Sequence, residues 1–252
     1  ARYLASVGDP TPPDGFALRA RYGDYVAALM APAIADGRIG HAATAATDVA
    51  PSGAGFTVRR ADGETTAARA VVLALGNEPP RPLRATGDRA RIVDDPWQQL
   101  AQLTPAPDDD VLLIGTGLTS ADVITVLRRG GHRGRITCVS RRGLPPTSHD
   151  GVSCAFNAAP ALPVPDELRR RPTALGLLRW LRPYGVPGVG ALRCDTTSLW
   201  IAMSLVERRR FLRHVRPYWD VVRHRVPPEV AAELTAGRAA GWLTMQAARL
   251  GD

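Results

Sequence analysis

Apolar and polar positions recur along this chain with two different periods, which predicts a mixture of helices and strands. Residues 22–36 place apolar side chains three and four positions apart, the spacing of an amphipathic helix. We expect this apolar stripe to pack into a core. Residues 38–67 read as extended chain, with Pro51-Ser52-Gly53 and Asp62-Gly63 as turn signals. The pattern there predicts a small antiparallel meander of three strands.

Residues 69–76, with the sequence RAVVLALG, form a continuous apolar run that ends in glycine. Such a run is typical of a strand buried on both faces of a layered sheet. Gly76 would let the backbone approach a ligand closely at the strand end, and Asn77 follows it. Gly76 and Asn77 are therefore candidate cofactor contacts, and a plain strand-to-loop glycine is the alternative.

Residues 111–140 contain the most specific pattern of the chain. An apolar strand at 111–114 leads into glycines, a helix is predicted at 119–129, and a second strand, RITCVS, at 135–140. This is a β-α-β unit of about 30 residues, the length that a right-handed crossover between parallel strands requires. A later helix at 229–236 and a strand at 241–250 extend the same pattern.

The turn inside this unit predicts a dinucleotide site. Its six residues, GTGLTS, are Gly115, Thr116, Gly117, Leu118, Thr119 and Ser120. In such a turn the first glycine permits the tight bend and the second leaves room for a pyrophosphate, which the helix N-terminus then binds. Ser120 stands where a third glycine is usual, and its small side chain still allows the helix to dock closely.

The end of the second strand indicates which nucleotide is bound. A site selective for NAD(H) carries Asp or Glu there to bind the ribose 2′-hydroxyl. This chain has Ser140, Arg141 and Arg142 instead. Because guanidinium groups pair well with phosphate, this favours NADP(H). A solvated arginine pair in an arginine-rich chain is the alternative.

Composition limits the remaining possibilities. The chain has 252 residues, 45% of them hydrophobic, and no apolar run reaches the ~20 residues of a membrane span. With no signal peptide at its start, we expect a cytoplasmic protein. The net charge of +8 raises nucleic-acid binding as an alternative. However, all 32 basic residues are arginine, which we attribute to compositional bias.

Other segments suggest organisation rather than chemistry. The polar, proline-rich residues 81–110 separate two predicted domains, 1–107 and 108–252. Short helices are predicted at 166–171 and 173–181, and one long helix at 197–215. His214 and His224 have no carboxylate or cysteine partner at ligand spacing, so no metal site is predicted. No catalytic residue can be named.

Three segments resemble the bacterial FAD/NAD(P)-binding proteins of the YdhS-like group: residues 18–30, 111–146 and 207–230. The resemblance implies a Rossmann-like three-layer α/β fold of the two-dinucleotide flavoprotein type, in which an NAD(P)H domain interrupts an FAD domain. Residues 1–107 would be part of the FAD domain. The stretch 73–77 would match the family's strand-end motif, with Leu75 in place of its threonine. We interpret the chain as a fragment without the N-terminal FAD fingerprint and the C-terminal return segment.

Three functions follow from these patterns. The first is an NADPH-linked flavoprotein oxidoreductase, or a monooxygenase-like enzyme, acting on an unknown small molecule. No GxSxG, CxxC or HExxH motif suggests a protein nucleophile, a redox cysteine pair or a zinc site. The second is a non-catalytic dinucleotide-binding or sensing module. The third is an arginine-rich nucleic-acid binder centred on residues 207–225, which the small number of aromatic residues there disfavours.

The resemblance predicts that this chain retains the NADP(H) site and has lost FAD. An FAD sheet without its central strand would leave neighbouring strand edges unpaired. The protein is therefore expected to purify colourless, as measured by its visible absorbance spectrum. A yellow preparation with the absorbance of oxidised flavin would contradict this expectation.

Overall fold

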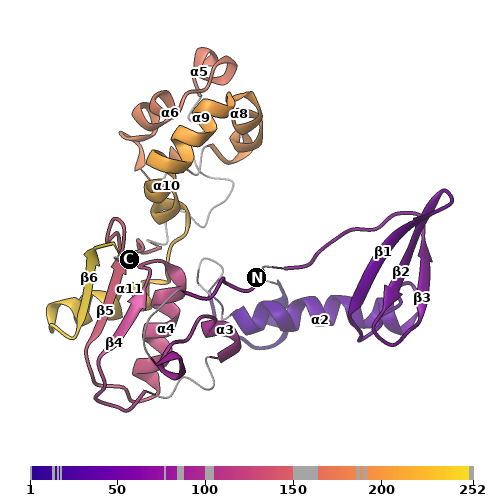
Figure 1. Cartoon of the computed structure of the whole chain (residues 1–252), viewed down its shortest axis with the longest axis horizontal. Coiled ribbons are helices and arrows are strands. Elements are labelled where there is room, and N and C mark those ends of the chain that lie inside the picture. Colours follow the sequence, from indigo (N-terminus) through magenta and orange to yellow (C-terminus); the bar gives the residue numbers. More distant parts are fainter. Residues whose placement is uncertain are drawn as a thin grey trace. The chain divides into compact units, whose positions relative to one another are not determined.

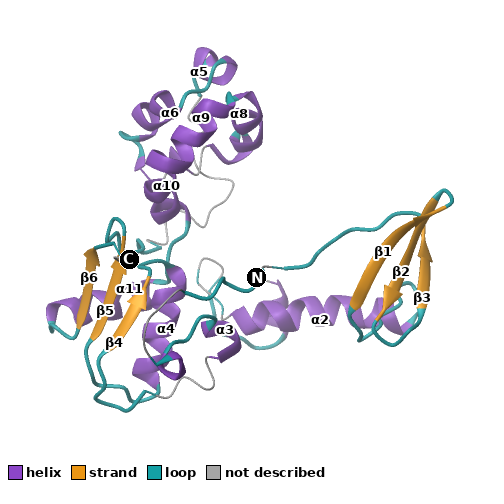
Figure 2. Ribbon diagram, in the orientation of Figure 1, coloured by secondary structure: helices purple, strands orange, loops and turns teal. Residues whose placement is uncertain are grey.

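The computed structural model describes residues 2–12, 15, 17, 19–76, 78–83, 88–99, 105–149, 164–185, 188–189 and 192–249. The chain divides into two compact units, Ala1–Asp94 and Asp95–Asp252. One contains a small antiparallel sheet and the other a parallel sheet with helices (Figures 1 and 2). This confirms the predicted fold class, a Rossmann-like α/β fold with an added meander. The predicted domain boundary at residue 107 stays a prediction.

The N-terminal unit, Ala1–Asp94, contains the predicted meander. Its strands pair in the order β1-β2-β3, and both pairs are antiparallel (Figure 2). Gly53 and Gly63 have positive φ in the two connecting turns, a conformation that favours glycine. The elements of this unit are α1 (Arg2–Ser6), α2 (Arg19–Ala35), β1 (Ala46–Ser52), β2 (Gly55–Arg60), β3 (Thr65–Ala68) and the short η1 (Arg89–Arg91).

Helix α2 confirms the predicted helix, but the expected packing of its apolar stripe is wrong. No residue of α2 is buried, and Tyr22 and Leu29 are 67% and 60% exposed. The buried residues of both hydrophobic cores come from the other unit, as far as the described residues show. The periodicity thus specified a helix with an apolar face but not a partner for that face.

Residues 69–76 do not form the predicted buried strand. These residues belong to no helix or strand, and Val72 and Leu75 are 89% and 83% exposed. A strand buried on both faces needs hydrogen-bonded neighbours, whereas the sheet of this unit consists of the three meander strands. Asn77, predicted to contact a cofactor, lies outside the described residues.

The C-terminal unit, Asp95–Asp252, is built on a parallel sheet whose strand order is β4-β5-β6. Successive right-handed crossovers in one direction place their helices on the same face of a sheet. Accordingly, α4 and α11 contact each other over one face. Ile124, Ile136 and Cys138 are the largest fully buried side chains of this core. The elements are β4 (Val111–Ile114), α4 (Leu118–Arg129), β5 (Ile136–Ser140), α11 (Pro228–Ala239) and β6 (Leu243–Ala247), preceded by the short α3 (Pro96–Gln99).

A group of helices lies between β5 and α11 in the sequence, and we call it the helical insertion (described residues 164–185, 188–189 and 192–223). It has a second hydrophobic core of its own, which includes Leu177, Leu199 and Met203. Its helices are α5 (Asp166–Arg170), α6 (Ala174–Leu181), η2 (Leu192–Cys194), α8 (Thr196–Ala202), α9 (Leu205–Arg210), the π-helical η3 (Phe211–Val215) and α10 (Arg216–Arg223) (Figure 1).

The single long helix predicted for residues 197–215 is wrong, because the chain breaks between α8 and α9. Met203 and Ser204 adopt extended conformations there. The Ser204 side chain accepts a hydrogen bond from the backbone N–H of Glu207, so it begins a new helix as an N-cap. Arg208 donates to the carbonyls of Trp200 and Ile201, which satisfies the end of α8. Across the described residues, no helix combines the length and apolar character that spanning a bilayer requires.

Truncation of Ile124 tests the core under the parallel sheet. Ile124 is fully buried, so Ile124→Ala should lower the free energy of unfolding by about 3 kcal/mol through lost burial and a cavity. Val126→Ala on the same helix is the control, because Val126 is 41% exposed and its loss should cost less than about 1 kcal/mol. Urea unfolding followed by tryptophan fluorescence isolates this unit, since all five tryptophans lie in it. Equal effects of the two substitutions would contradict the assigned core.

Candidate functional site

The connection from β4 to α4 forms the tight turn that the glycine pattern predicts. Gly115 has φ of 129°, which side-chain-bearing residues rarely adopt. Gly117 is the N-cap residue of α4, and a Cβ atom built on it would meet no atom within 4 Å. Gly117 has no side chain with which to cap α4, so the N–H groups of the first turn face the space above it. The turn is therefore shaped to accept an external hydrogen-bond acceptor.

Ser120 stabilises this turn through a hydrogen bond. Its hydroxyl donates to the carbonyl of Gly115 over 2.8 Å, and the side chain is buried. This bond links the first turn of α4 to Gly115, the residue that follows β4. Ser120 thus has a structural reason to replace the usual third glycine, while the neighbouring Thr119 is exposed.

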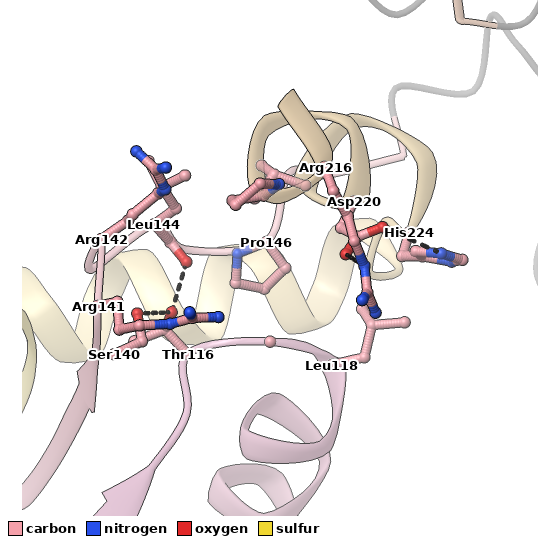
Figure 3. A pocket seen from close by; sticks show the side chains of 13 residues that line it. Thr116, Leu118, Ser140, Arg141, Arg142, Leu144, Pro146, Arg216, Asp220 and His224 are labelled. Carbon is pink, nitrogen blue, oxygen red and sulfur yellow. Dashed lines mark hydrogen bonds and ion pairs between the residues drawn. The ribbon is translucent and has the colours of Figure 1, made fainter. Parts of the chain in front are cut away.

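A chain of hydrogen bonds joins this turn to the loop after β5. The Thr116 hydroxyl donates to the Leu144 carbonyl over 2.7 Å and lies 2.9 Å from the Ser140 hydroxyl (Figure 3). Because a hydroxyl has one proton, Ser140 must be the donor to Thr116. Ser140 in turn accepts from the Gly143 N–H over 2.9 Å. The two segments predicted to bind the nucleotide are therefore fixed to each other.

The two predicted phosphate-binding arginines point in different directions. Figure 3 shows the Arg141 side chain beside Thr116. The Arg142 side chain points away from both of these residues. Arg142 donates to the Tyr218 hydroxyl over 3.4 Å and to the Arg213 carbonyl over 3.2 Å. Its guanidinium carbon also lies 5.2 Å from the centre of the Tyr218 ring. Arg142 therefore connects the loop after β5 to the helical insertion.

The turn, the loop after β5 and α10 enclose a pocket of about 500 Å³. On the α10 side, Asp220 Oδ2 lies 3.1 Å from Arg216 Nε, and Asp220 Oδ1 lies 3.9 Å from His224 Nε2. Among the described lining residues, three arginines outnumber one carboxylate, which gives this lining an excess of positive charge. Its lining residues are Thr116, Gly117, Leu118, Ser140, Arg141, Arg142, Leu144, Pro146, Arg216, Pro217, Asp220, Val221 and His224.

The predicted site residues did not include any from α10. Arg216, Asp220 and His224 line the pocket and recur at four-residue spacing along α10 and its C-cap. That spacing is visible in the sequence, and it gives His224 a carboxylate neighbour, Asp220, contrary to the expectation stated above. The same spacing is equally typical of a solvated helix. Of the other predicted site residues, Gly115, Thr119 and Ser120 flank the pocket in the glycine turn. Gly76 belongs to the N-terminal unit and has φ of 73° in the unpaired segment.

The cysteine nearest to the pocket in sequence is chemically inert at neutral pH. Cys138 lies on β5, two residues before Ser140, and is fully buried. Burial raises the pKa of its thiol to about 11. The reactive thiolate is therefore scarce at physiological pH, and Cys138 serves the core rather than the pocket.

Comparison with known proteins identifies a related family over the first part of the chain. A family model described as FAD-NAD(P)-binding matches residues 1–78 of the 252. No curated protein matches the chain. The match supports an FAD/NAD(P)-binding type of domain, as the sequence resemblance implied, without distinguishing the cofactor. The matched range lies in the N-terminal unit, so the pocket of the C-terminal unit rests on its own geometry.

The hydroxyl of Thr116 can be tested by an isosteric change. Thr116→Val removes its hydrogen bonds to Leu144 and Ser140 in a buried position, so it should lower the free energy of unfolding by about 1–3 kcal/mol. Thr119→Val is the matched control, because Thr119 is exposed and should change stability by less than about 0.5 kcal/mol. Tryptophan fluorescence in urea gives both values. No loss of stability for Thr116→Val would refute the bonded arrangement.

Proposed function

We propose that this chain binds NADP(H) in the pocket above the β4–α4 turn and serves as the NAD(P)-binding part of a flavoprotein oxidoreductase. The observation that supports this most directly is the combination of an uncapped glycine turn with Arg141 at the adjoining strand end. Each feature alone occurs without a nucleotide, but together they match the two charged parts of NADP(H).

The glycine turn provides a place for the pyrophosphate. The open space over Gly117 admits phosphate oxygens close to the backbone. Helix α4 has 12 residues and presents its positive end and first-turn N–H groups to that space. Thr116 and Ser120 hold the turn in this shape through bonds to other parts of the protein, so their hydroxyls are used for positioning.

The loop after β5 provides a place for the adenosine and its 2′-phosphate. No acidic residue follows β5, so the usual partner of an NAD(H) ribose is missing at this position. Arg141 has the charge and geometry for a 2′-phosphate, with Arg142 adding positive charge nearby. Leu144 and Pro146 offer apolar surface beside them for the adenine ring.

NADPH, when bound, supplies a hydride to an acceptor, and the residues described above bind and orient the nucleotide. The residues around Gly76 do not fit an FAD site, because residues 69–76 are unpaired and exposed rather than part of a sheet. Membership of the YdhS-like group, a monooxygenase-like reaction and a small-molecule substrate remain part of this proposal and rest on the sequence resemblance alone.

A non-catalytic dinucleotide-binding or sensing module is the second candidate. It is favoured by the pocket lining, where Asp220 lies 3.1 Å from Arg216 Nε and 3.9 Å from His224 Nε2 and so is paired within the protein. An oxidoreductase should oxidise NADPH when an electron acceptor is added. A sensing module should bind NADPH with no turnover above the buffer rate.

The central test is the preference for NADP⁺ over NAD⁺, measured by isothermal titration calorimetry. The protein should bind NADP⁺ more tightly than NAD⁺. Arg141→Gln should weaken NADP⁺ binding at least about tenfold, the effect of one lost charge-assisted hydrogen bond, and leave NAD⁺ binding nearly unchanged. Arg129→Gln is the matched control, because Arg129 is exposed at the other end of α4 and does not line the pocket.

Two results would overturn the proposal. The first is a protein that binds neither dinucleotide. The second is a preference for NADP⁺ that Arg141→Gln and Arg129→Gln alter equally, since this would attribute the preference to overall charge rather than to the pocket.

A further inference from the structure

We infer that Arg216 of α10 is a ligand of the dinucleotide pyrophosphate, so that the helical insertion supplies the second side of the nucleotide site. This inference rests on the proposed function, because it assumes a dinucleotide over the glycine turn. It adds a phosphate-binding residue that lies about a hundred positions beyond the glycine turn in the sequence.

The Arg216 side chain points toward the start of α4. Figure 3 shows it extending from α10 toward Leu118, the first residue of α4. Arg216, Leu118 and Gly117 line the same pocket. The guanidinium group therefore faces the place where phosphate oxygens would contact the N–H groups of α4.

Arg216 and the N-terminus of α4 bring two positive charges close together. The N-terminus of a helix carries a partial positive charge, so cations are normally favoured at the opposite end. Arg216 points a full positive charge at the positive end of α4. This arrangement becomes favourable when an anion lies between the two, and a pyrophosphate is such an anion. The carboxylate of Asp220 partly balances this charge from the α10 side.

Asp220 also orients the Arg216 side chain. Its carboxylate accepts from Arg216 Nε over 3.1 Å, one helical turn further along α10. A guanidinium has five N–H donors in a planar fork, so a bond through Nε leaves its terminal amino groups as donors for phosphate oxygens. Asp220 is thus a positioning residue that aims the guanidinium across the pocket.

Arg142 has a different task in this arrangement. Its bonds to Tyr218 and to the Arg213 carbonyl hold the loop after β5 against the insertion beside the start of α10. Arg142 therefore helps to keep Arg216 at the pocket, whereas Arg141 faces the 2′-phosphate. Arg141 thus binds the 2′-phosphate, Arg216 binds the pyrophosphate, and Arg142 links the loop after β5 to the helical insertion.

Calorimetric titration with NADP⁺ and NAD⁺ distinguishes these tasks. Both nucleotides contain the pyrophosphate, so Arg216→Gln should weaken both by the same factor, about tenfold, and preserve their affinity ratio. Arg141→Gln should instead change the ratio. Arg223→Gln is the matched control, because Arg223 is exposed on the same helix, carries the same charge and does not line the pocket. Unchanged tryptophan fluorescence and urea midpoint verify that each variant is folded.

Each outcome has a distinct meaning. If Arg216→Gln behaves like Arg223→Gln while the unmodified protein binds NADP⁺, the inference fails and the proposed function stands. If Arg216→Gln lowers the preference for NADP⁺ over NAD⁺, Arg216 binds the 2′-phosphate and the inference is overturned. If the unmodified protein binds neither nucleotide, the proposed function itself fails.

Discussion

The hydrogen bond between the hydroxyls of Thr116 and Ser140 joins the carboxyl ends of two neighbouring parallel strands, and the candidate site depends on it. It places the glycine turn and the arginine loop at a fixed separation. Gly143 limits the loop further, because its φ is 60° and a Cβ there would lie 2.5 Å from the backbone nitrogen of Ala247 on β6. Only glycine fits there, so the loop leaves β5 along one path, and this path sets the directions of Arg141 and Arg142.

The part of the site that sequence predicts is the part built from local pattern. The bounds of β4, α4 and β5 agree with the predicted ranges to within one residue, because the strand, glycine turn and helix follow one another without interruption. Parallel pairing then brings Gly117 and Ser140 to one edge of the sheet without further information. The hydroxyl bond itself could not be predicted, since it depends on side-chain directions in two separate loops.

Other features escaped prediction because an apolar pattern specifies that a segment can be buried, not what buries it. Residues 69–76 have the composition of an inner strand, yet the meander offers them no pairing partner. The helix break at Ser204 has another cause. The apolar spacing favours one continuous helix, but the Ser204 side chain caps the N-terminus of α9 and so starts a new helix. The position of α10 depends on contacts between residues more than 70 positions apart, such as Arg142 with Tyr218.

These distant contacts have a mechanical consequence for the site. The helical insertion has its own core, so its place beside the sheet depends on links made by the loop after β5. Besides Arg142, Thr147 donates to the Val221 carbonyl over 2.7 Å and accepts from the Val226 N–H over 2.9 Å. The loop that carries Arg141 is thus also the loop that holds α10. A ligand that contacts both Arg141 and Arg216 would link the loop after β5 to α10. Nucleotide binding would therefore stabilise the position of the insertion, and that position would in turn favour binding.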